Sequence, residues 1–448
     1  MMVIKITTVL LVAVLTQVTV VFAQSPKPNI VIIIADDLGY GDVEFNNGWI
    51  ETPHLNRLAK DGLKFNDFHT SGAVCSPTRA GLLTGLYQYR VGVPGVIVAF
   101  KNNTEHKRGL DPSAITLPAL LKNGGYTTAL FGKWHLGYSK EFNPLYYGFD
   151  KFRGYLSGQI DYHSHVDLAG NFDWWNGFDQ SKEEGYSTHL ITRYATDFIR
   201  EKKDHPFFLV VSHEAVHGPY QGPGDSAFRV AGSSSAEAPR GQALKDKKQA
   251  FKLMMQEMDK SIGEIVKTLK DVGCEENTFI FFLSDNGGVN SVSSNLPFRG
   301  GKTQVWEGGH RVPAIAYWPG KIKPGASTDE LCNSLDIMPT ILSVSGIKAP
   351  KNYISDGTNL APLIFKGKDI GDRNFFWNAE NQEFKYGVRN KNWKLVMSRN
   401  GDPYLFNMTE DKEEQNNLAE KNPSTVEKMN KLYEQWKKDV GLAKYYSN

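Results

Sequence analysis

Two kinds of apolar segment alternate along most of the chain. One kind is a short run rich in β-branched and aromatic residues, such as residues 29–35 (NIVIIIA), as expected for a strand buried on both faces. The other has apolar residues at helical spacing, as in residues 187–203. Strands are expected at residues 29–35, 126–131, 207–211, 278–283 and 314–318. The alternation predicts an α/β fold in which helices sandwich a large, mainly parallel sheet.

Segments with a helical pattern lie between these predicted strands. Residues 242–271 form the longest amphipathic segment, with an apolar side made of Leu253, Met258, Ile262, Ile265 and Leu269. Shorter helices are expected at residues 53–62, 75–85, 116–122, 187–203 and 334–346, most of them bounded by a capping residue or a glycine. The polar stretch at residues 222–241 is rich in Gly and Ser, which is typical of a surface loop.

The pattern changes near residue 347. Short strand-like runs at residues 375–378, 386–389, 394–397 and 404–407 precede a final helix at 424–440. These runs predict a small antiparallel sheet with one helix. We therefore divide the chain into a signal segment at 1–23, a large α/β domain at 24–346 and a C-terminal α+β subdomain at 347–448.

The first residues read as an export signal. Lys5 precedes an apolar run at residues 9–22, and Val21-Phe22-Ala23 offers small residues at the usual cleavage spacing. Cleavage after Ala23 would make Gln24 the first mature residue, in a periplasmic, extracellular or lysosomal-type compartment. The run is short for a membrane span, and no cysteine follows it to carry a lipid, so no membrane anchor is expected.

Net charge narrows the classes of partner. The 51 Lys and Arg residues nearly balance 49 Asp and Glu residues, giving +2, and no long basic tract occurs. Nucleic acid and acidic membrane surfaces are therefore not indicated. An anionic substrate would need a local cluster of positive charge.

Polar side chains follow the predicted strands. Asp36 and Asp37 come directly after the first strand, and Asp285 and Asn286 follow the strand at 278–283. Carboxyl ends of parallel strands share one edge of a sheet, where ligands bind. Oxygen donors without His or Cys favour Ca²⁺ or Mg²⁺. The alternative is that each pair only forms a solvated turn.

Residues 73–85 (AVCSPTRAGLLTG) read as the start of a helix. Ser76 is expected to cap it, Pro77 suits the first helical position, and Gly85 suits a left-handed end. Cys75 would then lie just outside the positive end of the helix, with Arg79 near the same face. The alternative is an ordinary buried cysteine in front of a helix.

This segment resembles the signature of the sulfatase family: Cys-x-Pro-x-Arg followed by Ala-Gly-Leu-Leu-Thr-Gly. The resemblance is strongest to the arylsulfatase B-like glycan sulfatases and implies an alkaline-phosphatase-like fold. It also implies that a formylglycine-generating enzyme oxidises Cys75 to formylglycine. A hydrated aldehyde offers one hydroxyl to attack sulfur and a second that expels sulfate. The family's metal would be calcium, bound by Asp36, Asp37, Asp285, Asn286 and an oxygen of residue 75.

Further motifs carry implied roles. Lys133 and His135 match the family's Gly-Lys-x-His element, in which Lys contacts sulfate and His takes the hydrate proton. His217 resembles the histidine at the leaving oxygen, with His213 as its competitor. Lys302 resembles a second sulfate lysine, and Arg79 would hold the formylglycine and the metal-side carboxylates. The positive charges of the two lysines and Arg79 would stabilise the negative charge of the sulfuryl group that is transferred.

Residues 153–175 lack clear periodicity and mix aromatic with polar side chains, which suits a sulfated glycan. Candidate substrate contacts are Arg153, Ser157, Asp161, His163, His165, Trp174 and Trp175. The alternative is a packed insertion whose tryptophans belong to the core.

Other interpretations remain open at this level. The same superfamily includes phosphodiester and phosphonate hydrolases, although the Asp and Asn ligands here differ from a His-rich set. A non-catalytic binder of sulfated glycans is a further alternative, although every motif position is present. If Cys75 is modified, Cys274 and Cys332 could form one disulfide in an oxidising compartment.

Overall fold

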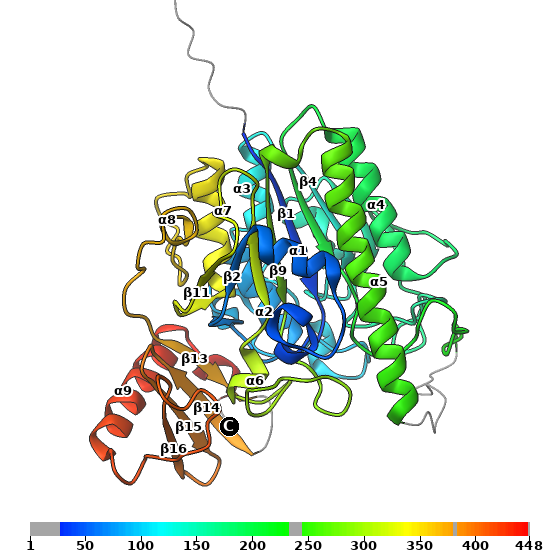
Figure 1. The fold of residues 1–448 in the computed structure, drawn as a ribbon. Helices are drawn as coiled ribbons and strands as arrows, with labels where there is room; N and C mark the ends of the chain where they lie inside the picture. The colour runs from blue at the N-terminus through cyan, green and yellow to red at the C-terminus, as the bar shows by residue number, and fades with distance from the viewer. Residues whose placement is uncertain (1–26, 233–243, 380–382, 447–448) are drawn as a thin grey trace, which may run out of the picture.

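The computed structural model describes residues 27–232, 244–379 and 383–446. The predicted signal segment lies outside these residues, as does the later part of the predicted loop at 222–241. The described chain forms one large sheet with helices on both faces and a smaller sheet beside it (Figure 1). None of the helices in the described ranges has the length and apolar character needed to span a membrane.

The large sheet is parallel at its centre. Its order is β11 (Ala326–Thr328), β2 (Leu63–Phe65), β10 (Ala314–Tyr317), β9 (Thr278–Ser284), β1 (Asn29–Ala35), β8 (Phe207–Ser212), β4 (Thr127–Lys133), β5 (Lys151–Tyr155), β6 (Trp175–Asn176) and β7 (Asp179–Gln180). Strands β9, β1, β8, β4 and β5 run parallel, whereas β10, β6 and β7 introduce antiparallel pairs at the flanks. The predicted mainly parallel sheet is confirmed.

Two hydrophobic cores lie on opposite faces of this sheet because successive strand residues point to opposite sides. Ile30, Ile32 and Ile34 of β1 pack in one core. Helices α2 (Cys75–Thr84), α3 (Leu117–Asn123), α7 (Ile337–Ser345) and α8 (Ala361–Lys366) contribute further residues to it. Val31 and Ile33 pack in the opposite core, under α1 (Pro53–Asp61), α4 (Ser187–Lys202) and α5 (Leu244–Asp271). Figure 1 shows α4 and α5 side by side over that face.

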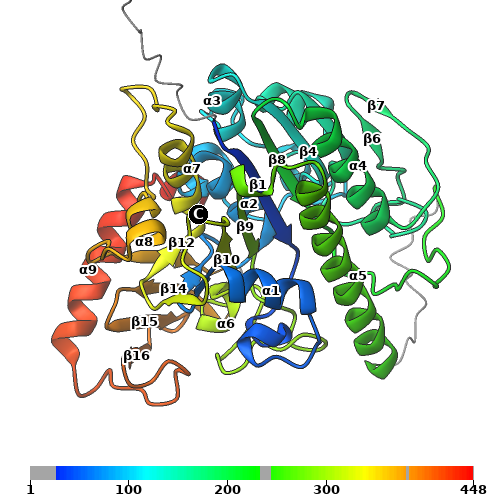
Figure 2. The ribbon, with the colours of Figure 1, turned by 45° about the horizontal axis from the view of Figure 1, so that its top comes forward.

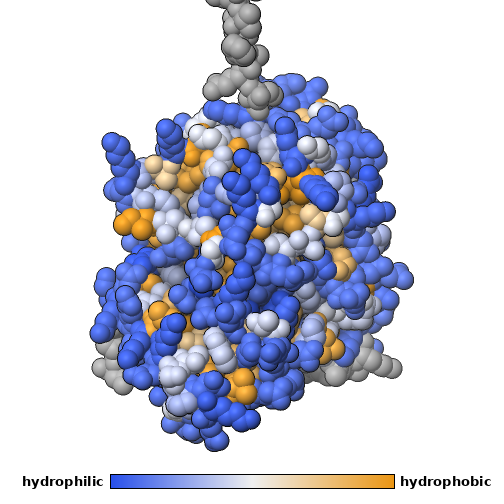
Figure 3. Space-filling view, turned by 60° about the vertical axis from the view of Figure 1, so that its left-hand side comes forward, coloured by the Kyte–Doolittle hydropathy of each residue, from blue (hydrophilic) through white to orange (hydrophobic). Residues whose placement is uncertain are grey.

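The smaller sheet is antiparallel, as predicted. It consists of β13 (Phe375–Asn378), β14 (Phe384–Arg389), β15 (Trp393–Ser398) and β16 (Pro403–Asn407). Helix α9 (Pro423–Asp439) packs on it through Met429, Tyr433 and Trp436, and the short α10 (Ala443–Tyr446) follows. This part lies on the side of the molecule away from α5 (Figure 2). The face seen in Figure 3 is largely hydrophilic, with apolar side chains in small separate groups.

Three local expectations were wrong. Leu253 is 38% exposed, although the rest of the predicted apolar side of α5 is buried. Cys75 is the first residue of α2 rather than a residue in front of it, and Val74 is the N-cap. The Ser76 hydroxyl instead accepts a hydrogen bond from the Ile97 N–H. Cys274 and Cys332 are both buried free thiols, so they do not form the disulfide considered above.

Candidate active site

The carboxyl edge of the large sheet brings the predicted site together. Asp36 follows β1, Lys133 ends β4, Ser212 ends β8 and Asp285 follows β9. The register pairs Ala35 of β1 with Ser284 of β9, so the residues after these two strands are neighbours. Segments far apart in sequence thus place charged groups at one position, as predicted from parallel topology.

Asp36 lies at the centre of this charge cluster and is fully buried. Its Oδ2 atom is 2.5 Å from the Lys133 ammonium, whereas its Oδ1 atom has no hydrogen-bond partner. Burial and the charge of Asp285 raise the pKa of Asp36 to about 7, against the opposing charge of Lys133. A further cation would relieve this cost, because a buried carboxylate is stable only when paired.

Asp37 has a left-handed backbone (φ 61°), which turns its carboxylate to a second set of partners. The Lys302 ammonium lies 2.7 Å from Oδ2, and the Asn286 amide donates to Oδ1 at 2.8 Å. His217 Nε2 lies 3.6 Å from Oδ2. Burial alone would raise the pKa of Asp37, but the charges of Lys302 and His217 hold this pKa below its ordinary value. Asp37 therefore stays ionised.

Arg79 joins helix α2 to the strand edge. Its Nε donates to Asp285 Oδ2 at 2.9 Å, and its Nη1 donates to Ser212 Oγ at 2.6 Å and to the Lys133 carbonyl at 3.2 Å. This planar fork fixes the Asp285 carboxylate relative to α2. The predicted role of Arg79 in holding metal-side carboxylates agrees with these contacts.

The donor set fits a hard cation. Asp36, Cys75 and Asp285 offer possible ligand atoms that all lie within 4.8 Å of one another. The buried Asp36 Oδ1 and Asn286 Oδ1 atoms lack hydrogen-bond partners and are available as ligands. Carboxylate and amide oxygens of this kind suit Ca²⁺ or Mg²⁺.

Cys75 is 3% exposed at the start of α2. Burial raises the pKa of its thiol, against the opposing charges of Lys133 and Lys302. A protonated, buried thiol is a poor nucleophile. Unmodified Cys75 is therefore not prepared for attack, although it adjoins the predicted metal ligands.

His135 is held as a neutral imidazole. Its Nε2 lies 2.8 Å from the Ile97 carbonyl, which places a proton on that nitrogen, and its buried Nδ1 has no partner. Burial, with the charge of Lys133, lowers the pKa of His135 well below its ordinary value. The unprotonated Nδ1 can accept a proton.

The structure separates the two candidate leaving-group histidines. His213 is buried and hydrogen-bonded to Ser261 of α5 at 3.0 Å, away from Asp37. His217 adjoins Asp37 instead, and its Nδ1 lies 2.6 Å from the Gly218 carbonyl. The chain between them is irregular rather than helical, so the two rings do not share a helical face.

The predicted substrate contacts are engaged with other parts of the protein. Ser157, Asp161, His165 and Trp174 are buried. Asp161 accepts bonds from the backbone of residues 163, 164, 228 and 229, and Trp174 stacks on His165 at 4.4 Å. Arg153 stacks over Tyr194, His163 bonds the Gly222 carbonyl, and Trp175 donates to Asp173. Their placement supports the alternative of a packed insertion, because each of these side chains has a partner within the protein.

Two residues of the site escaped the sequence reasoning. Ser212 binds Arg79, and its position at the end of β8 was the available signal. Gly158 faces His135: a Cβ atom at Gly158 would lie 2.6 Å from the imidazole, so only glycine leaves room for the ring. No signal in the sequence indicated this contact.

Comparisons with known proteins agree with this geometry. Residues 28–347 match the family model described as Sulfatase, and residues 301–440 match N-sulphoglucosamine sulphohydrolase, C-terminal. N-acetylgalactosamine-6-sulfatase of Mus musculus is 35% identical over 394 residues, covering 83% of this chain and 72% of the relative. Arylsulfatase G of Rattus norvegicus is 29% identical over 480 residues, covering 91% and 86%. Neither is an arylsulfatase B, so that finer resemblance stays a prediction.

The solved structure of Ps i-CgsB in complex with k-i-k-neocarrahexaose has a TM-score of 0.80 and 28% identity, and 92% of each chain is covered. The match extends over both sheets, which confirms the predicted fold class. With the family model spanning most of the chain, the conclusion is direct: the chain belongs to the sulfatase family and is a sulfuric ester hydrolase.

Proposed function

We propose that the protein is an exported, calcium-dependent glycan sulfatase whose nucleophile is a formylglycine made from Cys75 by a formylglycine-generating enzyme. The observation that carries this proposal is the meeting of Cys75, Asp36 and Asp285 within 4.8 Å, beside Lys133, Arg79 and Lys302. We keep 24–346 as the catalytic domain and 347–448 as the C-terminal subdomain.

Asp36, Asp37, Asp285 and Asn286 would hold the calcium ion, with an oxygen of the modified residue 75. The ion would neutralise a sulfate oxygen. The hydrated formylglycine would supply one hydroxyl for attack on sulfur and another for the release of sulfate. Unpaired Asp36 Oδ1 and Asn286 Oδ1 support this ligand set.

Side chains of the protein would bind the sulfate group and transfer the protons. Lys133 and Lys302 would bind the sulfate oxygens, where positive charge stabilises the transferring group. His217 would protonate the leaving oxygen, with Lys302 as the second candidate donor. His135 would take a proton on Nδ1, the nitrogen left free by the bond of Nε2 to Ile97.

A glycan substrate is supported by the relatives' names and by an aromatic surface. Trp49 is 43% exposed, its indole N–H donates to Asp42 at 2.8 Å, and its ring stacks on Phe251 at 6.2 Å. Tyr220 packs on Phe251 at 6.3 Å. Burial raises the pKa of Tyr220 to about 12, and the charges of Asp37 and Lys302 also act on it. The exposed Trp49 ring, linked to Tyr220 through Phe251, suits the apolar face of a sugar.

The central experiment measures sulfate release by ion chromatography across a panel of sulfated polysaccharides. A bis-aryl phosphate diester serves as the control for the phosphodiesterase alternative, and Cys75→Ala controls for contaminating activity. Peptide mass spectrometry should find formylglycine at position 75. Full turnover by a preparation that holds only unmodified Cys75 would contradict the proposal, as would faster cleavage of the diester.

Export is tested separately. Mass spectrometry of the exported protein should find Gln24 as its first residue, because the predicted cleavage follows Ala23. A mature chain that still carries residues 1–23 would overturn the signal assignment without touching the chemistry.

A further inference from the structure

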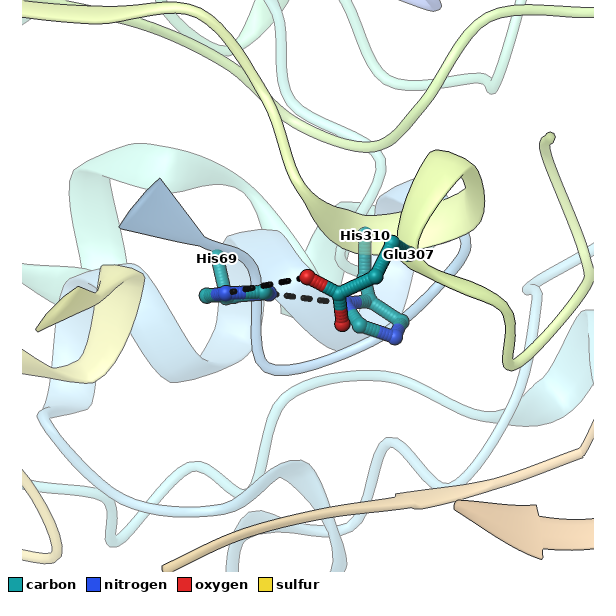
Figure 4. A group of neighbouring side chains, drawn as sticks. All are labelled: His69, Glu307 and His310. Carbon is teal, nitrogen blue, oxygen red and sulfur yellow. Dashed lines mark hydrogen bonds and ion pairs between the residues drawn. The ribbon is translucent and has the colours of Figure 1, made fainter. Parts of the chain in front are cut away.

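A second buried charge cluster lies where the C-terminal sheet meets the large sheet. It joins residues of β3 (Phe68–His69), α6 (Glu307–His310), β14 and β15 with residues of the neighbouring loops. Its members are Asp67, His69, Glu307, His310, Arg311, Arg389, Lys394 and Glu414, all buried. Figure 4 shows His69 beside Glu307 and His310, with dashed lines joining His69 to them. The catalytic mechanism above uses none of these residues.

A chain of short contacts runs through the cluster. Lys394 Nζ lies 2.9 Å from Glu307 Oε1, 3.1 Å from Glu414 Oε1 and 3.0 Å from His310 Nε2. His310 Nδ1 lies 2.9 Å from His69 Nδ1, so one ring donates a proton to the other. His69 Nε2 in turn lies 2.8 Å from Asp67 Oδ1.

His69, Glu307 and His310 lie close enough together to hold a metal ion, yet their partners argue against one. Both Nδ1 atoms are used in the bond between the rings. Glu307 is paired with Lys394 and with Arg311 at 3.1 Å. Three carboxylates (Asp67, Glu307 and Glu414) already face three cations (Arg311, Arg389 and Lys394), so an added divalent cation would be uncompensated.

The cluster connects to the segments that carry the catalytic residues. His69 begins the stretch that leads to Cys75, and Glu307 and His310 end the stretch that leads from Lys302. The Thr70 N–H donates to the His310 carbonyl at 2.8 Å, and the Thr303 N–H donates to the Ala73 carbonyl at 2.9 Å. The segment that leads to Cys75 and the segment that follows Lys302 are thus joined by backbone hydrogen bonds at both of their ends.

The loop after Asn286 joins the same assembly. The Gly287 N–H donates to the Gly309 carbonyl at 2.9 Å, and the Lys302 N–H donates to the Gly288 carbonyl at 3.0 Å. A Cβ atom at Gly287 would lie 1.8 Å from the Gly308 carbonyl oxygen, so this crossing requires glycine. Three segments that carry Cys75, Asn286 and Lys302 therefore share one backbone network.

The C-terminal sheet holds this network from outside. Trp377 of β13 stacks on His310 at 3.7 Å with the rings 10° apart, and its indole N–H donates to the Thr70 carbonyl at 2.7 Å. Lys394 of β15 bonds Glu307 and His310, and Arg389 of β14 lies 3.1 Å from Asp67. The sheet thus contacts both catalytic segments through buried side chains, although it contributes no residue to the proposed reaction.

We infer that Lys394 and Trp377 are positioning residues, through which the C-terminal sheet sets the placement of residue 75 and Lys302. The inference rests on the proposed roles of Cys75 and Lys302. Small displacements of reacting groups are costly, and a shift of about 1 Å can lower a rate roughly 100-fold. Loss of these contacts should therefore lower kcat more than the accompanying loss of stability explains.

The test compares two network variants with a matched control. Lys394→Met combined with Glu414→Gln removes one charge of each sign, which limits the cost of leaving an unpaired buried charge. Trp377→Phe removes the donor to Thr70. The control Tyr433→Leu removes a ring stacked on Tyr386 at 3.6 Å, inside the C-terminal part and away from both catalytic segments.

All variants are compared at equal formylglycine content, with kcat and KM on nitrophenyl sulfate and with hydrogen exchange of residues 69–75 and 301–310. We expect the network variants to lose kcat roughly 10- to 100-fold, with faster exchange in both segments. Tyr433→Leu should keep its kcat at a similar loss of stability. Network variants that match the control in kcat and exchange would overturn the inference. An inactive wild type would instead contradict the proposed function.

Discussion

Lys302 and Asp37 form a partly buried ion pair across 265 residues of sequence, with the ammonium 2.7 Å from the carboxylate. Asp37 is also a proposed calcium ligand, so Lys302 and the ion would share one anionic partner. Although burial opposes it, Asp37 raises the pKa of Lys302 above its ordinary value, which keeps the lysine charged. In the proposed site, calcium binding and sulfate binding would therefore be coupled through Asp37.

This coupling predicts opposite effects of Lys302→Met. Turnover should fall by roughly 10²–10³-fold, because a cation on the sulfate is lost. Calcium should bind at least as tightly as in the wild type, because a repelling positive charge has been removed from beside its ligand. Titration calorimetry on chelator-treated protein measures the second effect. Weaker calcium binding would mean that Lys302 organises the ligands instead of competing for one.

Asp285→Asn should weaken calcium binding and turnover together. Asp285 supplies one of the proposed anionic ligands and is fixed by Arg79 Nη2 at 2.8 Å. Fewer ligand charges lower the affinity of an oxygen-donor site, and we expect a loss of more than about tenfold.

Asp259→Asn is the matched control for Asp285→Asn. Asp259 is also a buried carboxylate, but it accepts the His54 and Leu55 N–H groups at the start of α1. Calcium affinity should be unchanged in the control. Unchanged affinity in Asp285→Asn as well would remove Asp285 from the ligand set.

Most of the fold and the strand-end residues of the site could be predicted from strand topology, whereas the roles of Arg79 and Lys302 came from the resemblance to sulfatases. The apolar run 29–35 is β1 to the residue, and the polar residues after β1 and β9 meet because parallel strands end at one edge. No alignment or structure was needed for that step, since an apolar run and its polar end are both local features of the sequence.

The remaining features depend on contacts that no local pattern contains. Ser76 is of a residue type that often caps helices, but its hydroxyl accepts a hydrogen bond from the N–H of Ile97, which is distant in sequence. Asp161 is of a residue type that often binds sugars, but its carboxylate accepts hydrogen bonds from backbone N–H groups instead. Residue type alone does not separate a polar side chain that satisfies its own loop from one that faces a substrate.

Trp49→Ala tests the proposed sugar-binding surface. Loss of the exposed indole should raise KM for a sulfated oligosaccharide by roughly tenfold, because aromatic contacts contribute about 1 kcal/mol or more beyond their buried area. Kinetics on nitrophenyl sulfate should be nearly unchanged, since that substrate carries no sugar for the indole to contact. Equal effects on both substrates would indicate damage to the Asp42 loop rather than a lost sugar contact.

His213 predicts a pH dependence of stability. Burial lowers its pKa from the ordinary 6.5 to about 3. Between these values the unfolded chain binds more protons than the folded one, so the free energy of unfolding falls as pH is lowered through 6.5 toward 3. His213→Gln keeps a partner for Ser261 and should reduce this slope by up to about 1.4 kcal/mol per pH unit. Denaturant unfolding at several pH values measures it, and an unchanged slope would contradict burial as the cause.

His217→Ala should separate two kinds of leaving group. A general acid contributes roughly 10²–10⁴-fold when the leaving oxygen is strongly basic, so that loss is expected on a sugar sulfate. Nitrophenolate departs without a proton, so the loss on nitrophenyl sulfate should be far smaller. His217 lies beside Asp37 and its side chain is 14% exposed, whereas His213 is fully buried, so His217 is the proposed proton donor.

His213→Gln is the control for this experiment, because His213 is buried against Ser261 and takes no part in the proposed step. It should leave the ratio of the two rates unchanged. Equal losses on both substrates in His217→Ala would show that the imidazole acts through sulfate or metal binding instead. The role of proton donor would then pass to Lys302, whose variant should show the same dependence on the leaving group.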